Sequence, residues 1–156
     1  MNNYEVSRGK RGFFFFRLSL TNQLIIVNVL CYLLSFVLIL IYGESFFSNN
    51  LAVTPGLVLS GQKVWTVFTS IFIHANLFHI FANMFSLFFL GNFLEKIIGR
   101  KRFFWLYLVA GILGSLFFVG AGFIFSNLTT PAVGASGALF GLLGVLAVLV
   151  PYSKIY

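Results

Sequence analysis

The sequence predicts an all-α membrane protein, a polytopic helical bundle of about four transmembrane helices. Hydrophobic residues make up 60% of the 156 residues, and charged residues make up only 8%. A soluble domain has about 25% charged residues, so this composition excludes an ordinary soluble surface. Mean hydropathy is +1.01, and the apolar residues gather in runs of about 20, the length that crosses the hydrocarbon core of a bilayer.

Residues 1–22 predict a basic N-terminal segment that lies on the cytoplasmic membrane surface. An aromatic run, residues 13–16, lies among basic residues, a pattern typical of interfacial segments. The basic residues are Arg8, Lys10, Arg11 and Arg17. A signal peptide is the competing interpretation. The apolar run at 23–42 is too long for a typical signal sequence and has no small-residue cleavage site after it, so it predicts the first transmembrane helix.

Three further spans are expected, at about residues 74–94, 103–125 and 132–150. Pro55 and Gly56 favour a turn, so residues 43–63 predict a loop.

The polar and interfacial residues of these segments carry further expectations. Residues 64–73 predict an entry segment to the second span. Asn28, inside the first span, is expected to face protein, because a polar side chain is costly in hydrocarbon. Trp105 and Tyr107 are expected to anchor the third span at the membrane interface.

The basic residues predict the orientation of the chain. Nine of the ten lie on one side of the expected spans, and Lys63 is the exception. Because basic residues stay inside, we expect a multi-pass protein of the cell membrane with a cytoplasmic N-terminus. Topology therefore explains the net charge of +7, and nucleic acid is not an expected partner.

The counts of reactive residues restrict the chemistry. The chain has one cysteine, Cys31, no aspartate, and two histidines, His74 and His79. A disulfide framework, a cysteine zinc site and a Ser-His-Asp triad within this chain are thereby excluded, and no metal or cofactor is expected.

Two polar features remain, and each allows a structural or a chemical interpretation. His79 and Asn83 are four residues apart and share one helix face, where they could form a helix–helix hydrogen bond, worth about 0.6 kcal/mol on average. Ser136 opens the fourth apolar segment within Gly134-Ala-Ser-Gly137, where small residues let helices touch. At a helix start, unpaired backbone N–H groups could also stabilise an oxyanion beside a nucleophilic serine.

Taken in order, the motifs resemble those of rhomboid intramembrane serine proteases. The matching stretches are His74-Ala-Asn-Leu-Phe-His79-Ile-Phe-Ala-Asn83, Gly91-Asn-Phe-Leu-Glu95-Lys-Ile-Ile-Gly99, and Gly134-Ala-Ser136-Gly137 leading to Gly141. The resemblance extends from about residue 21 to residue 150. It implies a core of six helices and cleavage of transmembrane protein substrates in the lipid bilayer, near its outer face.

The resemblance also implies roles for individual residues. Ser136 is implied as the nucleophile, and His79 and Asn83, with the Ser136 backbone N–H, as the oxyanion hole. His74 and Glu95 are implied as supporting residues. Close packing around the nucleophile is implied for the glycines of the last motif, Gly134, Gly137 and Gly141.

The general base is the main departure from the family pattern. The family's base histidine lies on the sixth helix, whereas the two histidines here match other positions. The resemblance therefore implies that residues 23–156 are a truncated rhomboid-like transmembrane domain, four helices of six, and that residues 1–156 alone do not cleave. The alternatives are a rhomboid-like pseudoprotease that binds transmembrane helices, and an unrelated four-helix scaffold or transporter subunit whose glycines serve packing only.

Overall fold

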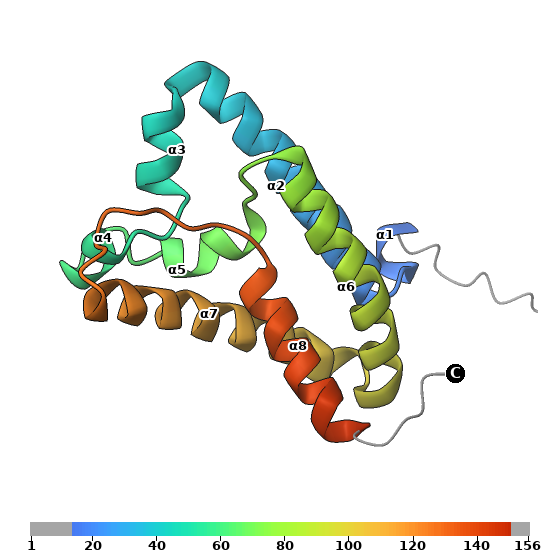
Figure 1. Ribbon diagram of the computed structural model, residues 1–156. Helices are drawn as coiled ribbons and strands as arrows, with labels where there is room; N and C mark the ends of the chain where they lie inside the picture. The colour runs from blue at the N-terminus through green and yellow to red at the C-terminus, as the bar shows by residue number, and fades with distance from the viewer. Residues whose placement is uncertain (1–13, 151–156) are drawn as a thin grey trace, which may run out of the picture.

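The computed structural model describes residues 14–150, and its long elements are all α-helices (Figure 1). Three of them are long and apolar enough to cross a membrane: α2 (Leu20–Tyr42), α6 (Leu77–Ile98) and α7 (Arg100–Ile124). The prediction of an all-α, polytopic membrane protein is thereby confirmed.

The helix within the expected fourth span, residues 132–150, is shorter than that span. The helix found there, α8 (Ser136–Leu149), has 14 residues, a length of about 21 Å against a hydrocarbon core of about 30 Å. Residues 132–135 are not helical, because they pair with other segments of the chain instead. Hydropathy alone did not separate this apolar, non-helical segment from the helix that follows it.

Two of the other spans begin at residues other than those expected, because of capping side chains. Helix α2 starts at Leu20 rather than at residue 23, since the Ser19 hydroxyl accepts a hydrogen bond from the Asn22 amide. Helix α6 starts at Leu77 rather than at residue 74, because Asn76 caps it by accepting from the His79 amide at 2.8 Å. Such side chains satisfy the free N–H groups of a first helical turn.

The ends of α6 and α7 lie at a sharp turn. Gly99, with a φ of 83°, separates α6 from α7. Helix α7 therefore begins at Arg100 instead of residue 103, and the three basic residues after Gly99 belong to the helix. A positive φ favours glycine, which has no Cβ to clash with the backbone.

Short helices occupy the region that was expected to be a loop and an entry segment. Residues 43–73 contain α3 (Glu44–Asn50), α4 (Pro55–Leu59), α5 (Thr66–Thr69) and a 3₁₀ turn, η1 (Ser70–Phe72). Pro55 is compatible with the first position of α4, where its missing N–H costs no hydrogen bond. The region is therefore folded structure that packs beside the spans.

The spans pack around a common core. Helices α2 and α6 lie side by side, and α8 packs against both α6 and α7 (Figure 1). Asn28 of α2 is fully buried and its amide nitrogen lies 3.3 Å from the Tyr107 hydroxyl of α7, so Asn28 faces protein as expected. Tyr107 is not an interface anchor, because it is fully buried in the core, whereas Trp105 is exposed.

Helices α7 and α8 cross at glycines. A Cβ placed on Gly114 would lie 2.8 Å from the Cα of Gly137, and one placed on Gly141 would collide with the Ala110 side chain. Small residues at a helix crossing allow the backbones to approach closely. This crossing fixes where the N-terminal end of α8, and Ser136 with it, lies in the bundle.

The expected basic segment, residues 1–22, lies largely outside the described residues. Its described part consists of α1 (Phe14–Arg17) and the first residues of α2.

Candidate active site

Ser136 is the first residue of α8 and its side chain is exposed. The residue before it, Ala135, provides no side-chain cap. The N–H groups of a first helical turn have no intrahelical acceptor and carry the positive end of the helix dipole. The hydroxyl of Ser136 therefore lies beside backbone donors that are suited to a negatively charged oxygen.

The segment that leads into Ser136 is held by backbone hydrogen bonds to residues 53–70. The Gly56 amide donates to the Leu128 carbonyl at 2.8 Å, and Val53 and Ala132 exchange two bonds of 2.9 Å. The Gly134 amide donates to the Ser70 carbonyl at 2.8 Å. Figure 1 shows this segment running from the end of α7 past α4 and α5 to α8.

Gly134 joins this segment to α6. Its φ is 121°, and a Cβ placed on it would lie 2.7 Å from His79 Nε2 and 3.6 Å from Asn83 Nδ2. No other residue would fit without displacing the imidazole. The structure thus brings together three residues singled out in the sequence: His79, Asn83 and Gly134. Gly134 lies two positions before Ser136 in the chain.

His79 and Asn83 are also joined to each other, and they face the same cavity as Ser136. Asn83 Nδ2 donates to the His79 carbonyl at 3.0 Å, which uses one of its two N–H groups and leaves the second available. Asn83 is buried and His79 is half-buried. Together with Ser136 they line a cavity of about 300 Å³ between α6 and α8, which otherwise is mostly apolar.

His74 lies behind His79. The two rings meet at 71° with their centroids 5.2 Å apart. His74 is 1% exposed, and neither of its ring nitrogens has a hydrogen-bond partner among the described residues. Burial, and secondarily the nearby His79, lower the pKa of His74 to about 4, because both disfavour the charged form. His74 is therefore a neutral ring that packs against His79.

Glu95 lies away from this cluster, at the other end of α6. One of its carboxylate oxygens accepts from the Leu20 amide at 2.7 Å, and the other accepts from the amide and the hydroxyl of Thr21 at 2.8 Å. Gly91, one turn earlier, leaves room for the Thr21 side chain. Glu95 thus joins the start of α2 to the end of α6.

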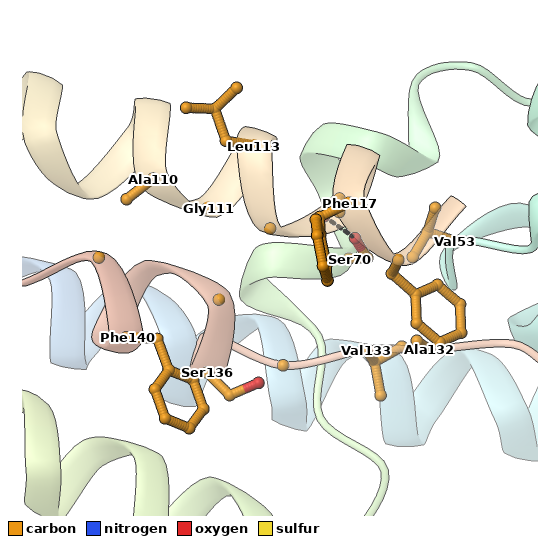
Figure 2. Close-up of a pocket in the computed structure, with 16 residues that line it drawn as sticks. Val53, Ser70, Ala110, Gly111, Leu113, Phe117, Ala132, Val133, Ser136 and Phe140 are labelled. Atoms are coloured by element: carbon orange, nitrogen blue, oxygen red, sulfur yellow. Dashed lines mark hydrogen bonds between the residues drawn. The ribbon is translucent and has the colours of Figure 1, made fainter. Parts of the chain in front are cut away.

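A larger cavity, of about 670 Å³, lies on the other side of Ser136 (Figure 2). Its walls come from α7, α8 and residues 132–134, and include Ala110, Leu113 and Phe140. Ser136 lines both cavities. Ser70, which also lines this cavity and holds Gly134, was not singled out in the sequence, because an isolated serine in an apolar stretch carries no signal of such a contact.

Residues 14–150 contain no group of three or more histidine, cysteine, aspartate or glutamate side chains placed to hold a metal ion.

The fold and this cluster define a polytopic membrane protein with an exposed serine at a helix start beside a histidine and an asparagine. The sequence model of the Rhomboid domain family matches residues 61–156, more than half of the chain, and the chain belongs to the rhomboid family.

Three relatives illustrate the range of the family. The chain is 44% identical over 98 residues to RHOMBOID-like protein 1 of Arabidopsis thaliana, and the aligned region covers 61% of this chain and 23% of that protein. It is 42% identical over 82 residues to Rhomboid protease GluP of Bacillus subtilis, and the aligned region covers 53% of this chain and 15% of that protein. It is 37% identical over 85 residues to Inactive RHOMBOID-like protein 8 of Arabidopsis thaliana, and the aligned region covers 54% of this chain and 23% of that protein. The matched part of the chain spans less than a quarter of each relative.

Proposed function

We propose that this chain is part of an intramembrane serine endopeptidase of the rhomboid type, which cleaves transmembrane segments of membrane proteins. One observation carries the proposal: the Gly134 backbone packs against His79 Nε2 and near Asn83 Nδ2, two residues before the exposed Ser136. Close packing of helices at small residues does not by itself require two polar side-chain donors near a serine in the uncapped first turn of a helix.

In the proposed reaction, Ser136 Oγ attacks the carbonyl carbon of the scissile peptide bond. The carbonyl oxygen becomes an oxyanion, which accepts hydrogen bonds from the Ser136 backbone N–H, from the free N–H of Asn83, and from His79 Nε2–H. Donors placed in advance around such an oxygen are typically worth a factor of about 10² to 10³ each in kcat. Collapse of this intermediate breaks the C–N bond and leaves an acyl group on Ser136, which water then hydrolyses.

The proton of the Ser136 hydroxyl requires a general base, which passes it to the leaving amine. In this proposal His79 serves as a hydrogen-bond donor, and His74 is buried behind it. On the family pattern, the base is a histidine of a sixth helix outside residues 1–156. Neighbouring structure would then have to place that histidine next to Ser136.

The charges of the helix ends support the proposed orientation. Four described basic residues lie at the turn between α6 and α7, and Arg17 lies just before α2; Lys63 lies in the region between α2 and α6. We therefore place the N-terminus in the cytoplasm and the Ser136 end of α8 at the outer face of the cell membrane. The substrates would meet Ser136 near that face.

A rhomboid-like pseudoprotease that binds transmembrane helices without cleaving them is the second candidate, and the inactive Arabidopsis relative favours its consideration. In that case the cavities beside Ser136 would hold a helix, and the serine would be unreactive.

Labelling with a fluorophosphonate probe distinguishes the two candidates. The full protein, in proteoliposomes, should be labelled at Ser136 and should cleave a transmembrane reporter, and Ser136→Ala should abolish both. Ser60→Ala is the matched control, because Ser60 is an exposed serine that lines neither cavity and should change neither. A folded protein whose Ser136 is not labelled and whose reporter stays intact would favour the pseudoprotease.

A further inference from the structure

A third pocket, which is polar, lies at the end of the helices opposite to Ser136, where α6 ends and α2 and α7 begin. It has a volume of about 250 Å³ and is lined by Ser19, Asn92, Glu95, Lys96 and Arg100. Glu95 is 16 residues after His79 on α6, a distance of about 24 Å along the helix. The pocket is therefore separate from the candidate active site.

Among residues 14–150, the basic side chains at this pocket have no acidic partner. Lys96 and Arg100 are exposed and line it, and the exposed Lys101 and Arg102 follow directly in α7. None of the four forms an ion pair with a residue of the described range 14–150. Glu95 is the only carboxylate among the described residues that line the pocket, and it accepts from three donors at the start of α2. The described part of the chain therefore leaves a net positive charge at this pocket, which suits an anion.

The first turn of α7 adds to this positive charge. It contains Arg100, Lys101 and Arg102 and no acidic residue. The N-terminus of a helix is the positive end of its dipole and favours acidic side chains, so three cations there repel both the dipole and one another. The preference for basic residues on the cytoplasmic side of a membrane explains why these three residues are positively charged. A bound anion would offset the repulsion between them.

An apolar surface continues from the pocket along α6. Phe93 and Ile97, each next in sequence to a pocket residue, are 50% and 47% exposed. Such a surface suits hydrocarbon chains, whereas the pocket suits a phosphate group. Basic pockets between helices at a membrane surface are typical sites for anionic lipid headgroups.

We propose that this pocket binds the phosphate headgroup of an anionic phospholipid. Lys96 and Arg100 contact the phosphate. The Ser19 hydroxyl donates to Asn92 Oδ1 and holds that side chain in place, and Asn92 Nδ2, which donates one N–H to the Phe88 carbonyl, offers its second N–H to the rest of the headgroup. The acyl chains lie along Phe93 and Ile97. The bound lipid would stabilise the junction of α2, α6 and α7, whether or not the protein is a protease.

The test compares two double variants of equal charge in the full, purified protein. Lys96→Gln with Arg100→Gln removes two charges from the pocket, and Lys101→Gln with Arg102→Gln removes two charges next to it. Native mass spectrometry in detergent measures how much phosphatidylglycerol is retained relative to phosphatidylcholine of the same chain length. The pocket variant should lose this preference by about fivefold for each charge, and the neighbouring variant should lose less than twofold.

Equal losses in the two variants would overturn the proposal, because general attraction between surface charges would then explain binding. Arg100 also donates to the Leu18 carbonyl at 2.9 Å, so the double variant could fail to fold for that reason alone. In that case Arg100→Lys, which keeps the positive charge, is used instead and should retain the lipid preference. Excess inorganic phosphate separates the two possible sources of the phosphate group. Retention of the lipid in its presence supports a lipid site, whereas full displacement would show a site for free phosphate and overturn the assignment to lipid.

Discussion

The imidazole rings of His74 and His79 meet at 71° with their centroids 5.2 Å apart. His79 is thereby held between His74 on one side and the backbone of Gly134 on the other, since a Cβ on Gly134 would lie 2.7 Å from His79 Nε2. The position of the candidate oxyanion donor thus depends on two residues that do not themselves contact a substrate in the proposed reaction.

Acid should destabilise the protein through His74. Its pKa in the folded protein is lowered to about 4 from the ordinary 6.5, so between these values the unfolded chain binds a proton that the folded chain does not. Stability should therefore be full above pH 6.5 and should fall as the pH drops from 6.5 to 4. Thermal unfolding in detergent across this range measures the effect.

The matched variants for this prediction are His74→Phe, which should lose much of the pH dependence, and His79→Phe, which should keep it. If His74→Phe follows the same pH profile as the wild type, then His74 is not the group responsible.

Gly134→Ala should abolish reporter cleavage while leaving the fold largely intact. A methyl group there collides with the His79 ring, and a φ of 121° is strained for alanine. Gly144→Ala is the control, because a Cβ on this glycine of α8 has no neighbour within 4 Å. Cleavage rates and melting temperatures of both variants check this, and full activity of Gly134→Ala would contradict the close contact with His79.

Gly114→Ala should destabilise the protein by about 1–3 kcal/mol. The new Cβ would lie 2.8 Å from the Cα of Gly137, and backbone atoms at a helix crossing cannot move away easily. Gly120→Ala on the same helix meets open space and should be neutral or stabilising by up to about 1 kcal/mol, because alanine favours helix. Unfolding in detergent measures both, and similar values for the two variants would contradict the crossing.

Asn83→Ala should lower kcat by about 10²- to 10³-fold with little change in KM, as expected for a donor that acts on the oxyanion. Asn50→Ala is the control, because Asn50 also donates to the carbonyl four residues earlier, at 2.9 Å, but on α3. Melting temperatures separate a catalytic from a folding effect. A rise in KM with unchanged kcat would assign Asn83 to substrate binding instead.

Glu95→Gln should destabilise the protein by about 2–3 kcal/mol, since Glu95 accepts three hydrogen bonds and a carboxylate is the stronger acceptor. Glu44→Gln, in the first turn of the exposed α3, should change stability by less than about 1 kcal/mol. Equal effects of the two changes on unfolding would indicate that the junction of α2 and α6 does not depend on this carboxylate.

The sequence by itself determined the class of the protein and the approximate place of three spans. The reason is physical: the transfer of a segment into a bilayer depends on its summed hydropathy and length, which are local properties. Local chemistry also identified His79, Asn83 and Ser136 as unusual polar residues in apolar surroundings. The first residues of the helices were predicted less well, since the caps at Ser19 and Asn76 place the starts of α2 and α6 three residues away from the expected positions.

Only the tertiary structure decided what these residues do to one another. Residues 132–135 are as apolar as a helix, yet they are not part of one, because Val53 binds the backbone of Ala132 and Ser70 that of Gly134, far away in sequence. Tyr107 is buried in the core shared by the helices, where its hydroxyl meets Asn28 of another helix. The contact of Gly134 with His79 depends likewise on how α6 and α8 are placed by the crossing at Gly114 and Gly137. Such contacts join segments distant in the sequence, and no local pattern specifies them.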